Sequence, residues 1–427
     1  IYSILKDNID SEDIDEADIE AFFDGDGDDE EDDISNNVIK LSFIERIFED
    51  SYVFCQKVLG FKSSKNTNTS LKIVRINSIN DDIYINTKIS KINNKKVKFE
   101  NTLMVSSGIK ESKIGVRVFE VNEDFETLLK TTKVFYQKLN FFSFYRGIVR
   151  TEECDQMYHM NVQFYFDKHS KAVKKFTNHI FKNKLFKIKS ERCIFYKEVH
   201  EFSALEIVIF VKNLKKNHLT LQSKLYCTSK HYVSAYFETE ISFESDAKQI
   251  FKAVDSLLQK KQNTFVNDFN FMKLRKIRPF RILKKPSKNS IITCKKASNA
   301  WDLDFDGYAT HRFLISCVSD AATQLFTKCG VNHKWRADYQ IGSAALDYIV
   351  RYYNYPTIGM AVSLKSNFIE VNEKSFKFCH HLIDDASNRV LMDIQIAAVL
   401  FDLKKRVAMK LPNSFRKKAE ALLIKNQ

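Results

Sequence analysis

The sequence has few of the residues that usually interrupt helices and strands, with 10 glycines and 4 prolines among 427 residues. It also lacks an uncharged apolar run of about 18 residues, the length that a membrane-spanning helix requires. The longest apolar stretches, such as Leu205–Val211, have the length of a strand. These absences argue against a membrane span. With 44% hydrophobic residues, the chain can bury the cores of two to three globular domains.

Paired cysteines are absent as well. The eight cysteines are scattered without a C-x-x-C pair and without histidines at the spacing that zinc ligands need. The pattern argues against a zinc site and against a disulfide scaffold, and it favours a reducing compartment. We therefore expect no metal and no bound cofactor.

Positive charge is missing from one segment only. Asp7 to Asp33 holds sixteen acidic residues and no Lys or Arg. Removing residues 1–33 takes away these sixteen negative charges and one positive charge, that of Lys6, so the total of +13 becomes +28 for the remainder. Such a body is expected to attract polyanions such as RNA, anionic lipid head groups or the acidic segment itself, although basic residues can also merely solubilise a surface.

One order of predicted elements recurs along the chain, and a recurring order is stronger evidence of architecture than a local motif. An amphipathic helix between Ser42 and Gly60 precedes four strand-like segments: 71–76, 83–92, 96–106 and 114–121. A strand at 142–150 and a loop lead to a helix over Val162–Phe181, then to strands at 192–199, 203–212, 219–228 and 232–243. A loop at 303–310 leads to a helix over His311–Gly330, then to strands at 345–353, 359–371, 375–384 and 390–402.

The most informative segment is Arg150-Thr-Glu-Glu-Cys-Asp155-Gln-Met-Tyr158-His159-Met-Asn161-Val-Gln-Phe-Tyr165. It resembles the D-x-x-G-H-x-N-x-x-x-Y signature of hotdog acyl-CoA thioesterases, and it stands between a strand and a long helix as that signature does. Residues 301–312, with Gly307 and His311, resemble the same loop in a second copy. Residues 141–418 together look like the double-hotdog acyl-CoA thioesterase-like family, within the 4-hydroxybenzoyl-CoA and acyl-ACP thioesterase superfamily.

The resemblance implies an α+β chain of hotdog folds, in which an antiparallel sheet wraps a long central helix and two hotdogs pair as a tandem pseudo-dimer. The first repeat, without an opening strand or loop, is expected to be a third, degenerate copy. The expected divisions are an acidic, disordered arm at 1–41, the degenerate module at 42–135, the hotdog with the D-x-x-x-H-x-N loop at 136–260, a basic connector at 261–296 and the C-terminal hotdog at 297–427.

The resemblance also implies an acyl-CoA or acyl-carrier-protein substrate. Thioester hydrolysis needs a carboxylate that activates water or attacks directly, and donors for the developing oxyanion. Asp155 is the candidate carboxylate, and His159 and Asn161 are candidates for orienting the substrate. Tyr165, Tyr158, Gly307 and His311 are candidate substrate-binding residues. Tyr158 replaces the family glycine, and its bulk is expected to fill part of the site.

A second hypothesis is a catalytically silent scaffold in a large assembly such as the mitochondrial ribosome, in contact with RNA and neighbouring proteins. The substituted glycine, the degenerate module and the basic connector favour it. Its candidate anion-binding residues are Arg275, Lys276, Arg278, Arg281, Lys284 and Lys285. The bacterial type of the family in a chain with Asn- and Lys-rich insertions makes a mitochondrial location our expectation. An open pocket beside Asp155 would favour the enzyme, and a filled one would favour the scaffold.

Overall fold

The structure is a computed structural model, and its chain divides into two compact units, residues 1–139 and 140–427. It describes residues 47–49, 51–53, 55–56, 67–71, 82–93, 96–107, 110–121, 143–181, 186–215, 217–230, 232–243, 250, 252, 283–304, 306–405 and 407–424. The expected acidic arm at 1–41 lies outside these residues.

The N-terminal unit contains four antiparallel strands in the order β1-β4-β3-β2. Their bounds are β1 Thr67–Leu71, β2 Asp82–Asn93, β3 Lys96–Ser107 and β4 Lys110–Val121. The expected helix between Ser42 and Gly60 is helical at the described residues 47–49, 51–53 and 55–56. Phe48 and Tyr52 come from this segment and meet the sheet, where the Tyr52 ring stands edge-on to Phe119 at 4.7 Å. The helix therefore covers one face of the sheet.

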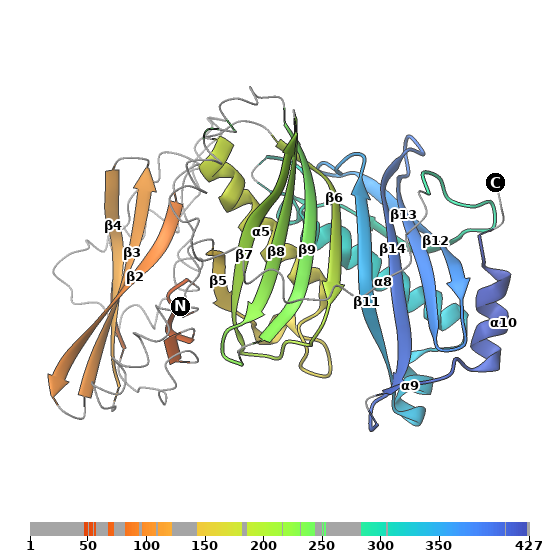
Figure 1. Ribbon diagram of the computed structural model, residues 1–427, viewed down its shortest axis with the longest axis horizontal. Coiled ribbons are helices and arrows are strands. Elements are labelled where there is room, and N and C mark those ends of the chain that lie inside the picture. The colour runs from red at the N-terminus through yellow and green to blue at the C-terminus, as the bar shows by residue number, and fades with distance from the viewer. Residues whose placement is uncertain are drawn as a thin grey trace, which may run out of the picture. The chain divides into compact units, whose positions relative to one another are not determined.

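The C-terminal unit holds one 11-stranded antiparallel sheet with the order β10-β12-β13-β14-β11-β6-β9-β8-β7-β5, and β15 pairs with β14. Its strands are β5 Ser143–Ile148, β6 Phe186–Phe195, β7 Ala204–Lys215, β8 His218–Cys227, β9 Tyr232–Phe243, β10 Ile291–Ala297, β11 Ile341–Tyr352, β12 Ala361–Val371, β13 Ser375–Asp384, β14 Val390–Asp402 and β15 Val407–Ala408. The helices are α5 Val162–Phe181, α8 His311–Lys328, α9 His333–Tyr339 and α10 Asn413–Ala421. Figure 1 shows the sheet in front of α5 and α8.

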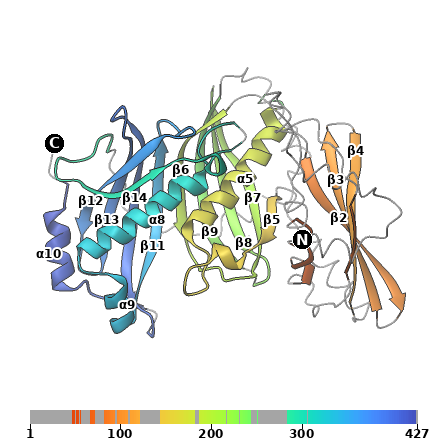
Figure 2. The same ribbon diagram turned by 180° about the vertical axis from the view of Figure 1, so that it is seen from behind.

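Two hotdogs make up this unit. Each has a first strand, a long helix and four more strands, and in each the spatial order of the five strands is 1-3-4-5-2. The second strands of the two hotdogs, β6 and β11, pair antiparallel and join the sheets. Helices α5 and α8 contact each other and lie on the same face, as seen from behind in Figure 2. The predicted tandem pseudo-dimer is confirmed.

The N-terminal unit has the same spatial order once the first strand is left out, because β1, β4, β3 and β2 correspond to hotdog strands 2, 5, 4 and 3. The described strands of this unit thus have the order of hotdog strands 2 to 5.

Several expected boundaries were wrong, among them the start of β1, which is Thr67 and not Leu71, and the start of β11, which is Ile341 and not Ala345. The basic connector was placed at 261–296, but residues 291–297 form β10, which pairs with β12 as the first strand of the C-terminal hotdog. Strand β6 spans Phe186–Phe195 and begins earlier than the expected 192–199. An irregularity between Ile188 and Ser190 shifts the register of β6 against β9, and this breaks the alternation of side chains on which the prediction relied.

Candidate active site at the start of the central helices

The loop before α5 is a tight turn closed by backbone bonds. The amide of Asp155 donates to the carbonyl of His159 at 2.8 Å, and the amide of Tyr158 donates to the carbonyl of Asp155 at 3.0 Å. A short 3-10 helix, Thr151–Glu153, precedes the turn, and the carbonyl of Glu153 accepts a bond from the amide of Asn161. These bonds place Asp155, Tyr158 and His159 at the edge of the sheet immediately before the helix.

The Asp155 carboxylate is exposed, and one of its two oxygens accepts hydrogen bonds. Its Oδ1 accepts hydrogen bonds from the amides of Met157 at 2.8 Å and His159 at 3.1 Å. Among the described residues, no protein donor bonds its second oxygen, Oδ2. The side chain is thus held in one orientation while one oxygen remains accessible to water or substrate.

His159 lies beside Asp155 in the chain but faces the loop after β6. Its Nε2 is 3.5 Å from Oε2 of Glu198, and its ring stands edge-on to His200 at 4.6 Å. Asn161 caps α5, because its Oδ1 accepts a bond from the amide of Gln163 at 3.2 Å. The three predicted catalytic residues therefore share one loop, but each already has a partner within the protein.

Tyr158 lies on the surface of the loop. Its side chain is 65% exposed, and its backbone has φ of 59°. This left-handed conformation explains why the family uses glycine here, because other residues are strained in it. Tyr165 is buried, and its hydroxyl lies 3.2 Å from the Ser234 hydroxyl, so it contributes to the core beneath the loop.

The loop before α8 repeats this backbone with different side chains. The amide of Asp304 donates to the carbonyl of Tyr308, and that of Gly307 donates to the carbonyl of Asp304. Asp304 thus corresponds to Asp155, Gly307 to Tyr158 and Tyr308 to His159. Gly307 has φ of 75°, as the turn requires. The C-terminal loop therefore keeps the glycine but has a tyrosine in place of the histidine.

His311 is the first residue of α8 and corresponds to Val162 at the start of α5. It is buried, with Nδ1 2.9 Å from Oε2 of Glu191 and its ring stacked on Tyr352. Its position makes it a residue of the interface between the hotdogs. Tyr308, and not His311, occupies the place of His159, and a substrate-binding role of His311 stays a prediction.

Two acidic loops are fixed by different lysines. Buried Lys168 of α5 donates to Oε1 of Glu153 at 2.7 Å and to the Tyr145 hydroxyl at 3.2 Å. Burial alone would lower the pKa of Lys168, but Tyr145 and Glu153 raise it above its usual value. In the other loop, Asp304 is bonded to Lys174 of α5, across the hotdog interface.

Sequence reasoning missed Lys168, His169 and Glu191. All three are buried, and a signal for His169 was available. It lies three residues after Phe166 and four before Val173, on the apolar face of α5. Glu191 and Lys168 carried no comparable signal, because a charged residue in a strand or helix is usually at the surface.

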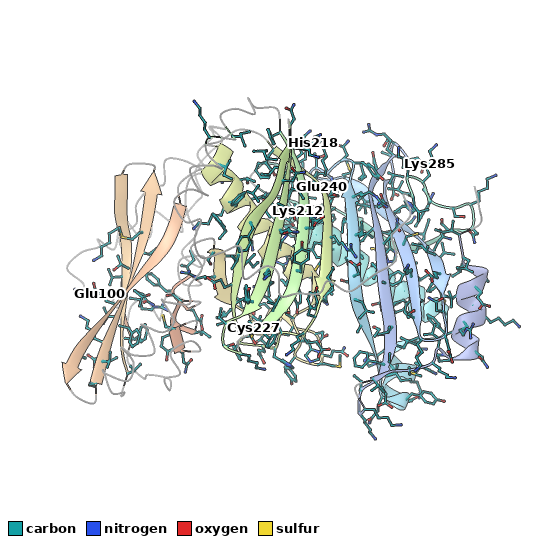
Figure 3. The ribbon with its side chains drawn as sticks, viewed as in Figure 1. Glu100, Lys212, His218, Cys227, Glu240 and Lys285 are labelled. Atoms are coloured by element: carbon teal, nitrogen blue, oxygen red, sulfur yellow. The ribbon has the colours of Figure 1, made fainter. Side chains whose placement is uncertain are left out.

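The predicted anion-binding residues Arg275, Lys276, Arg278 and Arg281 lie outside the described residues. Lys284 and Lys285 are described and exposed, and Figure 3 labels Lys285 beside the strands of the C-terminal hotdog. Within the described parts of the chain, no group of three or more His, Cys, Asp or Glu side chains is arranged to hold a metal ion. No described helix is long and apolar enough to cross a membrane.

Three similar solved structures are described as thioesterases, at low sequence identity. A Lactobacillus plantarum protein described as an oleoyl thioesterase is 10% identical, with 60% of this chain and 94% of that chain covered and a TM-score of 0.46. An acyl-ACP thioesterase from Bacteroides thetaiotaomicron is 11% identical, with 60% and 96% covered and a TM-score of 0.43. The 12:0-ACP thioesterase from Umbellularia californica is 7% identical, with 60% and 93% covered and a TM-score of 0.43.

No curated protein matches the chain in sequence. A family model does match, and it covers residues 149–260 and 298–419, which is more than half of the chain. The first matched segment begins just before the loop that precedes α5 and ends beyond β9. The second begins directly after β10 and ends within α10. The chain therefore belongs to the thioesterase-like superfamily.

Proposed function

We propose that this protein hydrolyses acyl thioesters of CoA or of an acyl carrier, and that the reaction takes place at the loop before α5. The observation that carries the proposal is the state of Asp155. Its Oδ1 is fixed by two backbone amides, its Oδ2 is unengaged by described residues, and the side chain is exposed. A fixed, accessible carboxylate is what a general base for water requires.

In the proposed step, Asp155 takes a proton from water while the water oxygen bonds to the thioester carbonyl carbon. The carbon–sulfur bond then breaks, Asp155 returns its proton to the sulfur, and the products are a thiol and a carboxylic acid. The partial positive charge at the start of α5 is suited to stabilise the oxyanion that forms between these events. His159 and Asn161 hold the turn and the helix start, so they act as positioning residues.

The corresponding loop before α8 is proposed to be silent. Its carboxylate, Asp304, is bonded to Lys174, and Tyr308 stands where the first loop has His159. The ammonium group of Lys174 occupies a carboxylate oxygen that a water molecule would otherwise contact. One catalytic site per chain follows from this difference.

The test is turnover of short, medium and long acyl-CoA substrates by the purified chain. Asp155→Asn keeps the shape of the side chain and removes the base, so it is expected to lower kcat by a factor of about 10² to 10⁴. Asp304→Asn is the matched control and is expected to leave kcat unchanged. Equal rates in wild type and Asp155→Asn, or no turnover with any chain length or carrier, would contradict the proposal.

A scaffold role in a large mitochondrial assembly is the second candidate. It is favoured by the N-terminal unit, because the residues described there include no counterpart of the Asp155 turn. The charge of +28 outside residues 1–33 suits an RNA partner.

Purification of the native protein separates the two candidates, because a scaffold is expected to migrate within a megadalton particle. In that case neutralising Arg275, Arg278 and Arg281 should weaken the association and reduce its salt dependence. An enzyme is expected to migrate by itself and to keep its turnover when these three arginines are replaced.

A further inference from the structure

Two cysteines of the C-terminal hotdog lie next to each other, away from the Asp155 loop. Cys294 comes from β10, at the edge of the 11-stranded sheet, and Cys317 comes from α8. Cys317 is buried, whereas Cys294 is partly exposed and packs against the same core. Both are free thiols, and the Cys317 thiol donates a hydrogen bond to the Cys294 sulfur.

The contacts of Lys296 fix β10 against α8 at the level of the two thiols. Its Nζ lies 2.6 Å from Oδ2 of Asp320 and 3.3 Å from Oγ of Ser316, and these two residues are about one turn apart on the helix. Cys317 follows Ser316 directly. Lys296 and Cys294 share one face of β10, because side chains two positions apart in a strand point to the same side.

The other hotdog has a contact at the same two positions. Cys294 corresponds to Tyr145, because each is the residue at which its strand resumes regular pairing after a register shift. Cys317 corresponds to Lys168, since both are the seventh residue of their helix. Lys168 Nζ lies 3.2 Å from the Tyr145 hydroxyl, so side chains at these positions meet in both hotdogs. Packing at this place therefore does not itself require two cysteines.

Cys294 is the more reactive thiol of the pair. The hydrogen bond from Cys317 and the charge of Lys296 lower the pKa of Cys294. Burial and the charge of Asp320 act in the opposite direction and are outweighed. The contact with Cys294, together with burial, raises the pKa of Cys317 far above its usual value. A partly exposed thiol with a lowered pKa beside a lysine is the kind that oxidants attack.

Cys154 has a similar exposure and the opposite surroundings. It is also partly exposed, but burial and nearby carboxylates, with Glu201 acting most strongly, raise its pKa to about 11. Its Sγ donates to the carbonyl of Arg150 at 3.4 Å. Partial exposure alone is therefore not what distinguishes Cys294. The distinction comes from the second thiol and the lysine beside it.

We propose that Cys294 and Cys317 form a peroxide-sensitive modification site, in which the two thiols close reversibly into a disulfide that joins β10 to α8. The Cys294 thiolate attacks an oxygen of a hydroperoxide, the O–O bond breaks, and the leaving alkoxide or hydroxide takes a proton from water. The Cys317 sulfur then attacks the sulfenic acid formed on Cys294, and the leaving hydroxide combines with the Cys317 proton to give water. The two sulfurs are oxidised and the hydroperoxide is reduced.

The disulfide encloses residues 295–316, which include the turn at Asp304 and the first residues of α8. It therefore ties the strand before the second loop to the helix after it. A dithiol reductant restores both thiols by exchange. The site does not depend on the proposed catalysis at Asp155, because it lies in the other hotdog.

Peptide mapping of the full chain, after treatment with hydrogen peroxide and then alkylation, tests the site without any variant. The expected result is a pair of peptides linked through Cys294 and Cys317, which separates when dithiothreitol is added before alkylation. Cys154 is expected to remain a thiol in the same sample. Absence of the link, irreversible oxidation of Cys294 in its place, or equally fast oxidation of Cys154 would overturn the proposal.

Variants test the two roles separately. In Cys317→Ala the sulfenic acid on Cys294 has no partner, so it is expected to accumulate and to be trapped by dimedone. Lys296→Met is expected to slow the oxidation of Cys294 several-fold. Lys295→Met is the matched control, because Lys295 is exposed on the other face of β10 and should leave the rate unchanged. Equal rates in the two lysine variants, or equal trapping in Cys317→Ala and the wild type, would contradict the assigned roles.

Discussion

The two loops that begin the central helices have nearly the same backbone and different chemistry. In both, an aspartate amide bonds to a carbonyl four residues later, and a residue with positive φ sits three positions after the aspartate. One loop combines Asp155 with His159, and the other combines Asp304 with Tyr308. The comparison teaches that the backbone turn is a property of the fold, whereas the availability of its carboxylate depends on side chains from elsewhere.

The anchoring of the loops shows the same principle. Lys168 ties the first loop to α5 of its own hotdog through Glu153. The residue of α8 that corresponds to Lys168 is Cys317, so the second loop has no such tie. Lys174 of the other hotdog bonds Asp304 instead and lies 3.8 Å from a carboxylate oxygen of Asp306. The first loop is thereby fixed through Glu153, and the exposed carboxylate of Asp155 is not needed to anchor it.

The largest effect on stability is expected from breaking the anchor of the first loop. Lys168→Met leaves the Glu153 carboxylate buried without its cation, which is expected to cost about 3–5 kcal/mol of unfolding free energy. Urea unfolding measures this loss. Lys334→Met is the control, because Lys334 and its partner Asp338, 3.0 Å apart, are both exposed. The control is expected to lose about 0.5 kcal/mol or less. Equal losses in both variants would show that the anchor does not stabilise the loop.

Acid is expected to destabilise both hotdogs through buried histidines. Burial lowers the pKa of His169 in the first hotdog, and burial together with the charge of His381 lowers the pKa of His380 in the second to about 3. A depressed folded-state pKa means that the unfolded chain binds the proton more readily. Stability is therefore lost as pH falls below about 6.5, by up to about 1.4 kcal/mol per pH unit for each group.

The check is the unfolding free energy between about pH 7 and pH 5, where carboxylates contribute little. His380→Asn should reduce the slope of that curve by the contribution of one histidine. A wild-type curve that is flat over this range would contradict the assignment of neutral, buried imidazoles to the two hotdogs.

The smallest effects are expected at the positions of positive φ, and they should have opposite signs. Tyr158→Gly relieves a left-handed conformation and is expected to stabilise the chain by about 0.5–1 kcal/mol. Gly307→Ala imposes the strain and is expected to destabilise it by about 1 kcal/mol, although the added Cβ meets no atom within 4 Å. Thermal unfolding measures both. Shifts of the same sign would mean that the two turns do not share one conformation in solution.

Much of the fold could be predicted from the sequence. The helix α5 and the strands β9, β13 and β14 have the bounds that periodicity indicated, because apolar residues repeat there without interruption. Strand β10 was missed because lysines surround its short apolar run. Strand β6 was misplaced because its register is irregular near Ile188.

The candidate site could be predicted only in part. The motif placed Asp155, His159 and Asn161 on one loop because they are close in sequence. It did not indicate that Tyr158 would point to solvent, or that Asn161 would cap the helix. It also did not indicate that Asp304 would be bonded to Lys174, since 130 residues separate the two.

The sequence by itself determined the repeated order of elements, the two loops and the lengths of the central helices, because these depend on side chains close together in the chain. Only the tertiary structure decided which carboxylate is accessible and which is bonded to a lysine. It also decided that Glu191 and His311 meet across the junction of β6 and β11, where the pKa of Glu191 depends on burial and on partners from the other hotdog. Charge states of this kind are set by the packed interface, because removal from water makes each group depend on the partner it meets.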